Sequence, residues 1–216
     1  MRRGPSARDD GAVLDHLVYA GPDLADAVAR VAALTGVTPA PGGRHVGLGT
    51  ANHLADLGAG MYLEVIGPDP DQPDPEAPRP FGIDELTEPA LVAWAVRTPD
   101  IDATIGAARA HGFDPGDATE MSRETADGET LRWRLTPPSV PGTLYPFLID
   151  WGSTPHPTTR GLPSIPLLMV TATHPDPASV HTATDALNLE FLVRRAAKAS
   201  LTAALRTPEG RQVALS

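Results

Sequence analysis

Apolar residues recur along the chain in three segments that share one plan: a short strand-like run, a Pro-Asp step, and a stretch with apolar residues three or four positions apart. The strand-like runs cover residues 14–20, 91–96 and 167–173, and the steps are Pro22-Asp23, Pro99-Asp100 and Pro175-Asp176. Proline ends a strand because it lacks an amide hydrogen, and the aspartate after it can cap a helix N-terminus. Each segment therefore predicts a strand followed by an amphipathic helix.

After each predicted helix the sequence becomes strand-like again. The expected strands are 45–51, 53–57 and 61–66 in the first segment, 118–124, 129–136 and 144–150 in the second, and 191–196, 200–205 and 212–215 in the third. This order predicts an α+β fold of repeated βαβββ modules. We expect a disordered arm at 1–11, module 1 at 12–67, a Pro-rich linker at 68–89, module 2 at 90–152, a linker at 153–163 and a third module-like unit at 164–216.

Charge and composition exclude several classes of partner. The formal net charge is −10, and nucleic acids and anionic membranes both favour a basic surface instead. Cysteine is absent, which excludes disulfides and thiolate chemistry and fits a reducing cytoplasm. No apolar stretch approaches the roughly 20 residues that span a bilayer. We therefore expect a cytoplasmic protein whose partner is a small molecule.

Glu64 stands at the centre of the apolar run 61–66 and is the clearest candidate for chemistry. An ionised carboxylate in apolar surroundings requires a cation, a metal or a bound proton. The candidate partner is His16, which lies inside the apolar run 14–19. Strand alternation lets both side chains face one site if the two strands are neighbours. The alternative is a buried pair without metal.

The sequence resembles the vicinal oxygen chelate (VOC) superfamily, and within it the uncharacterised glyoxalase-like proteins. Members pair βαβββ modules into a cupped mixed β-sheet with helices outside, and they include glyoxalase I, extradiol dioxygenases and antibiotic-resistance proteins. The resemblance extends over residues 14–157. It is carried by Leu14-Asp15-His16-Leu17-Val18-Tyr19, Gly42-Gly43-Arg44-His45, Gly49-Thr50-Ala51-Asn52-His53-Leu54, Tyr62-Leu63-Glu64-Val65-Ile66, and Phe147-Leu148-Ile149-Asp150-Trp151-Gly152 with Pro155-His156-Pro157.

The resemblance implies that His16 and Glu64 bind a divalent metal ion, such as Zn, Ni, Mn or Fe. Superfamily enzymes add ligands from the second module, and there this sequence departs from the pattern. Ala93 stands where the first of these ligands is expected, and Ile149 aligns with Glu64. Asp150 is the nearest carboxylate, and a β-bulge would be needed to turn it inward. A metal site and a site without metal therefore both remain open.

Five other residues are candidates for substrate binding: His45, Asn52, Trp133, Trp151 and His156. Each also has a purely structural interpretation, as a turn cap, a loop residue or ordinary core. The leading hypothesis is a metal-dependent enzyme that acts on a small oxygen-chelating molecule as a lyase, isomerase or dioxygenase.

In the first two reaction types Glu64 or Asp150 would move a proton. A dioxygenase would bind iron through two histidines and a carboxylate, with His45 as the second histidine. The alternative is a protein of the same fold that binds a small molecule or antibiotic without chemistry. The third unit suggests a homodimer, formed by pairing with its counterpart in a second chain.

Overall fold

The computed structural model describes residues 12–125, 128–138 and 140–216, so the arm predicted at 1–11 lies outside the described residues. The elements are, in chain order, β1 (Val13–Ala20), α1 (Leu24–Thr35), β2 (Ala40–His45), β3 (Thr50–Gly58), β4 (Met61–Pro68), η1 (Pro80–Glu85), β5 (Ala90–Arg97), α2 (Ile101–Ala110), β6 (Thr119–Thr125), β7 (Thr130–Leu135), β8 (Phe147–Asp150), η2 (Pro157–Arg160), β9 (Leu167–His174), α3 (Pro177–Ala186), β10 (Leu192–Arg195), β11 (Ser200–Arg206) and β12 (Gln212–Leu215). No helix in these ranges is long and apolar enough to cross a membrane.

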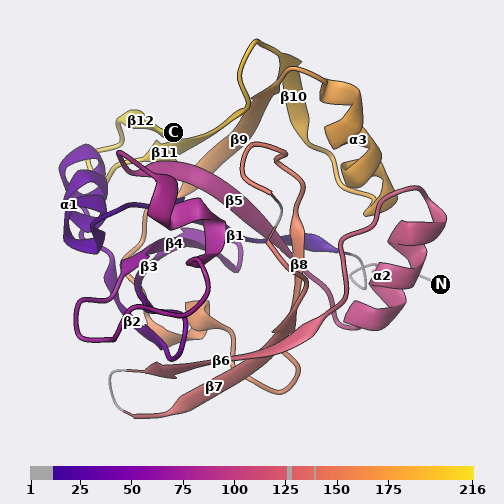
Figure 1. Cartoon of the computed structure of the whole chain (residues 1–216). Helices are drawn as coiled ribbons and strands as arrows, with labels where there is room; N and C mark the ends of the chain where they lie inside the picture. Colours follow the sequence, from indigo (N-terminus) through magenta and orange to yellow (C-terminus); the bar gives the residue numbers. More distant parts are fainter. Residues whose placement is uncertain (1–11, 126–127, 139) are drawn as a thin grey trace, which may run out of the picture.

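The first eight strands close into a barrel in the order β1-β4-β3-β2-β6-β7-β8-β5 (Figure 1). Strand β1 runs parallel to β4, the last strand of its own module, and antiparallel to β5 of the second module. A second seam joins β2 to β6. The two modules thus form one curved mixed sheet, and the predicted α+β fold of paired βαβββ modules is confirmed.

Alternation along the strands divides the apolar core into two clusters. Leu17 and Tyr19 of β1 pack in the cluster that includes residues of α1 and α2, on the outside of the barrel. Val18 and Ala20 pack in the second cluster, inside the barrel. Because successive side chains of a strand point to opposite faces, the residue two positions before Val18, His16, also faces the interior. The barrel interior is therefore where the site must lie.

The hairpin from β2 to β3 differs from the prediction. A continuous strand was expected at 45–51, but the structure has a turn between His45 and Thr50, which pair with each other. Gly47 and Gly49 within this turn have φ angles of 82° and 61°, a region that L side chains rarely adopt. The turn places His45 at the very end of β2, where its ring can face the barrel interior.

The third unit has the predicted element order but a different strand order, β10-β9-β11-β12. Its first strand, β9, pairs with β10 and β11, whereas β1 pairs with the last strand of module 1. The third unit therefore repeats the element order βαβββ but not the strand order of the two modules. The third unit packs on the outside of the barrel, where Phe191 stacks on Trp94 at 4.4 Å and α3 lies beside α2 (Figure 1).

Candidate functional site

A cavity of about 260 Å³ occupies the barrel interior between the two modules. Most of its wall is aliphatic or aromatic, and a polar cluster interrupts this wall on the side of module 1. Ligand sites are typically of this kind, an apolar pocket with a few convergent polar groups. The lining residues are His16, His45, Leu48, Asn52, Leu54, Tyr62, Glu64, Ile66, Pro80, Phe81, Thr119, Met121, Arg123, Trp133, Leu135, Pro137, Pro138, Phe147, Ile149 and Trp151.

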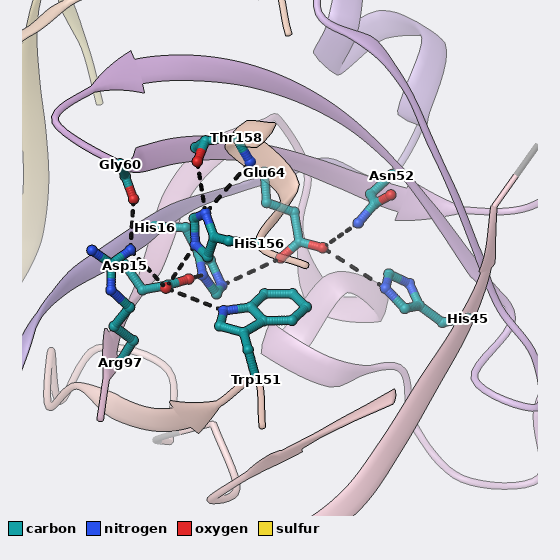
Figure 2. Close-up of polar contacts among 10 residues, drawn as sticks. All are labelled: Asp15, His16, His45, Asn52, Gly60, Glu64, Arg97, Trp151, His156 and Thr158. Atoms are coloured by element: carbon teal, nitrogen blue, oxygen red, sulfur yellow. Dashed lines mark hydrogen bonds and ion pairs between the residues drawn. The ribbon is translucent and has the colours of Figure 1, made fainter. Parts of the chain in front are cut away.

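Glu64 is the centre of the polar cluster (Figure 2). Its side chain projects inward from β4, and the residue is only 7 % exposed. Oε2 lies 3.8 Å from Nε2 of His16, and Oε1 lies 3.8 Å from Nε2 of His45. Asn52 donates a hydrogen bond from Nδ2 to Oε1 at 2.6 Å. The carboxylate is therefore held by one amide and stands between two imidazoles.

His16 is fixed by contacts on both faces of its ring and at Nδ1. Tyr62 stacks on the ring at 4.6 Å, and Phe147 meets it edge-on at 5.4 Å. Nδ1 lies 2.6 Å from Oδ1 of Asp15. An ionised carboxylate can only accept, so the network assigns the proton of the neutral ring to Nδ1. Nε2 then faces Glu64.

Asp15 connects His16 to the second module. It is wholly buried, and its Oδ2 accepts hydrogen bonds from Nε1 of Trp151 at 3.2 Å and Nε2 of His156 at 3.0 Å (Figure 2). Burial pushes the pKa of the Asp15 carboxyl up, but the hydrogen bonds from His156 and His16 outweigh it, so that pKa lies well below its usual range. Asp15 is therefore an anion, and its hydrogen bond with Nδ1 orients the His16 ring.

The sequence-predicted residues fall into two groups. His45, Asn52, Trp133 and Trp151 line the cavity together with His16 and Glu64. His156 is outside the lining and contacts Asp15 instead.

Asp150 also lies outside the cavity lining, because Phe147 and Ile149 are the residues of β8 that face inward. The bulge that would have turned Asp150 inward is not among the register shifts of the described strands. Its carboxylate accepts from the backbone N–H of Gly152 at 2.8 Å. Asp150 has no part in the function proposed below.

Two polar residues of the site were missed by the sequence reasoning. Asp15 was not among the predicted site residues, and the pairing of β1 with β5 shifts register beside it, between Leu14 and His16. Arg123 lines the cavity from β6 with Met121, two positions away. Arg123 alternates along β6 with the exposed residues Ser122 and Glu124, and this alternation could have indicated that Arg123 faces the cavity.

The donor chemistry of the cluster fits a divalent metal ion. His16, His45 and Glu64 supply two imidazole nitrogens and a carboxylate, a set that divalent transition metals accept. In both histidines Nδ1 is held by an oxygen of a neighbouring side chain, as is typical of metal-binding histidines. As these side chains stand, no group of three or more His, Asp or Glu residues in the described ranges is arranged to hold a metal ion.

Burial also sets the protonation of the cluster. The pKa of His45 lies below its ordinary value because burial disfavours the imidazolium, although the charge of Glu64 opposes this. Burial likewise raises the pKa of the Tyr62 hydroxyl well above its usual value. At neutral pH, His45 and Tyr62 are therefore uncharged around Glu64.

Comparison with known proteins agrees with this architecture. A hypothetical protein from Staphylococcus aureus superposes with a TM-score of 0.64 at 14 % identity, over 94 % of this chain and 98 % of that one. A variant of 4-hydroxymandelate synthase from Streptomyces coelicolor gives a TM-score of 0.52 at 12 % identity, over 94 % of this chain and 61 % of that one. Methylmalonyl-CoA epimerase from Mycobacterium tuberculosis gives 0.39 at 15 % identity, over 68 % and 91 %.

At these identities the two matches with TM-scores of 0.64 and 0.52 establish the fold alone. No curated protein matches the chain in sequence. A family model, described as a glyoxalase-like domain, matches residues 14–188, which include both modules of the barrel and the cavity between them. The chain therefore belongs to the glyoxalase-like domain family and has the VOC fold.

Proposed function

We propose that the chain is a metal-dependent enzyme, of the lyase or isomerase type, that moves a proton on a small carbonyl compound in the barrel cavity. One observation carries this proposal: the buried carboxylate of Glu64 faces Nε2 of both His16 and His45 at 3.8 Å. A buried carboxylate that lies between two imidazoles favours a proton or a cation nearby. The cluster is thus suited to handling positive charge.

Glu64 is the proposed general base. The bond from Asn52 holds Oε1, and the carboxylate lies in the wall of an otherwise apolar cavity. Glu64 would take the proton from the carbon next to a carbonyl, and the electron pair of the C–H bond would move toward the carbonyl oxygen. Delivery of a proton to the opposite face of the same carbon would invert its configuration, and return of the proton to the neighbouring carbon would isomerise the substrate. Neither outcome needs an oxidant or reductant.

The two histidines would support this step from either side. Asp15 would fix the His16 ring so that Nε2 stays directed at Glu64 and is available as a metal ligand. His45 is neutral at pH 7 because burial lowers its pKa, so its ring can also bind a metal ion. A divalent ion held by His16, His45 and Glu64 would polarise the carbonyl and stabilise the enolate charge.

A second candidate function is binding of a small molecule without chemistry. It is favoured by Ala93 and Ile149, the apolar residues of module 2 that align with His16 and Glu64. In this alternative His16 and Glu64 form a structural pair, and the aromatic wall supplies the affinity. A ligand that binds tightly but is never altered, in a protein without metal, would favour it.

Metal content tests the metal-dependent form of the proposal. The protein is purified without chelators or a metal-affinity column, and bound metals are measured by mass spectrometry in the parent, in Glu64→Gln and in Glu124→Gln. Glu124 is an exposed glutamate of β6, so its variant controls for the loss of one negative charge. We expect near-stoichiometric metal in the parent and the control, and its loss in Glu64→Gln.

The identity of the metal then separates the reaction types. Iron would favour a dioxygenase, because two histidines and one carboxylate are the ligands of non-haem iron oxygenases. Zinc, nickel or manganese would favour the lyase or isomerase form. No metal in any variant after reconstitution would remove the metal from the proposal.

Location and assembly also belong to this proposal. We propose a cytoplasmic enzyme that forms a homodimer through the third unit. Light scattering checks the second point, and a monomer at micromolar concentration would contradict it.

A further inference from the structure

Arg123 is a buried cation in the cavity wall that makes no direct contact with a carboxylate of the described residues. It is only 4 % exposed, and Nη1 donates to Oδ1 of Asn52 at 3.0 Å, its one side-chain hydrogen bond within those residues. Exposed arginines such as Arg134 and Arg160, by contrast, each contact a carboxylate. Because a buried charge is costly unless it is paired, this guanidinium is suited to pairing with an anion in the cavity.

Asn52 sets the position of this cation relative to the reactive carboxylate. Its Oδ1 accepts from Arg123, and its Nδ2 donates to Oε1 of Glu64 at 2.6 Å. The two bonds fix the orientation of the amide, and one amide group separates the guanidinium from the carboxylate. A small molecule can therefore reach both groups at once.

Two glycines of β2 make the space that Arg123 and Asn52 occupy. A Cβ atom at Gly42 would lie 2.3 Å from Oδ1 of Asn52 and 2.5 Å from Nη1 of Arg123. At Gly43 a Cβ would lie 3.0 Å from Cγ of Arg123 and 2.0 Å from the backbone oxygen of Glu124. Any larger residue would displace these groups. The Gly42-Gly43 pair thus specifies the place of the guanidinium in the cavity wall.

The remaining wall limits the rest of the ligand. Trp133 and Trp151 lie with their rings 5.3 Å apart, and Phe81 and Phe147 add a second aromatic pair at 5.9 Å. The cavity of about 260 Å³ has room for a small organic group between these rings. The body of the ligand is therefore small and apolar.

We infer that the substrate carries a carboxylate, which Arg123 binds, on a small apolar or aromatic body. The planar guanidinium matches a carboxylate through two parallel N–H···O bonds. A dianion would be less favourable, because Glu64 lies one amide away. This inference rests on the proposed function and deepens it, because it names the substrate class of the same cavity.

A matched pair of probes tests the anion site without any turnover. Phenylacetate and 2-phenylacetamide have the same size and shape, and only the first is charged. Titration calorimetry with the unaltered protein gives the Kd of each. We expect the acid to bind about 10- to 100-fold more tightly than the amide, as hydrogen bonds to a charged group imply.

Three variants locate the preference for the acid. Arg123→Met should reduce the ratio of the two Kd values to about 1. Arg123→Lys keeps the positive charge but loses the two parallel N–H donors of the guanidinium, so it should give an intermediate ratio. Arg132→Met is the matched control, since Arg132 is exposed on the neighbouring strand β7 and does not line this cavity. Circular dichroism checks that each variant is folded.

Three results would overturn the inference: equal Kd values for acid and amide in the unaltered protein, binding of neither probe, or a preference that persists in Arg123→Met. The first two are read from the unaltered protein, so they stand even if Arg123→Met does not fold. Because binding alone is measured, the inference can fail while proton transfer by Glu64 succeeds, and the reverse also holds.

Discussion

Asp15 joins module 1 to the segment that follows module 2, and a double-mutant cycle with His156 measures the strength of that link. The two residues are 141 positions apart in the chain, and Nε2 of His156 donates to Oδ2 of Asp15 at 3.0 Å. Removal of a buried charge partner typically costs about 3 to 5 kcal/mol, because it leaves the other groups unpaired. We expect Asp15→Ala to lose about 3 to 5 kcal/mol of unfolding free energy, since Trp151 and His16 also lose their acceptor.

The coupling between the two residues is the quantity that tests the reasoning. A hydrogen bond to a charged group contributes about 1.5 to 3 kcal/mol. The unfolding free energy lost in the double variant should therefore be smaller, by about that amount, than the sum of the losses in the two single variants. The assay is urea unfolding of the parent, Asp15→Ala, His156→Ala and the double variant. Circular dichroism and tryptophan fluorescence must give coincident transitions for the values to be used.

An exposed ion pair provides the control for this cycle. Arg134 makes two bonds to Asp102, at 2.7 Å and 2.9 Å, on the surface of the barrel. Water screens this pair, so its cycle should show a much weaker coupling than that of Asp15 with His156. A coupling below about 0.5 kcal/mol between Asp15 and His156 would refute the link, because that is the scatter expected for independent sites.

Three further predictions follow from the packing and the charges. The pKa of Asp15 is lower in the folded chain than in the unfolded chain, so the unfolded chain binds more protons at acidic pH. The free energy of unfolding should therefore fall as the pH drops from about 5 to about 3. Urea unfolding should show a smaller fall in this free energy for Asp15→Asn. Gly42→Ala should cost about 1 to 3 kcal/mol by overpacking against Asn52, whereas Gly106→Ala, in open space on α2, should stabilise by about 0.5 to 1 kcal/mol in the same assay. Phe191→Ala should loosen the third unit from Trp94, which hydrogen-exchange protection of β9 to β12 would reveal; unchanged protection would contradict this.

The sequence was most informative about features that are set within a single strand or helix. Alternation within β1 and β4 is a property of each strand, and it correctly placed His16 and Glu64 on one side of two neighbouring strands. The Pro-Asp steps likewise predicted the caps of the first two helices, where Asp23 and Asp100 accept from the first turn. Asp176 occupies the same position in the third unit, but its side chain makes no capping bond.

Features that depend on contacts between distant segments were not predicted. Gly42 and Gly43 have low strand propensity, yet they lie in β2 because the side chains of Asn52 and Arg123 fill the space beside them. The register shift that brings Asp15 beside His16 arises from pairing with β5. The strand order of the third unit is likewise set by which strands meet after the chain has folded, and the repeated element order did not reveal it.

Deuterium incorporation tests the central claim, that Glu64 moves a proton on a carbonyl substrate, most directly. A panel of small carboxylate-bearing and neutral α-hydroxy ketones is incubated in D₂O with the parent, Glu64→Gln and Glu124→Gln, and proton NMR measures exchange at the carbon next to the carbonyl. We predict exchange with the parent and with Glu124→Gln, and a rate about 100-fold lower in Glu64→Gln, the lower end of what general acid–base catalysis contributes. Equal exchange in the parent and in Glu64→Gln, or no exchange above buffer across the panel, would contradict the account.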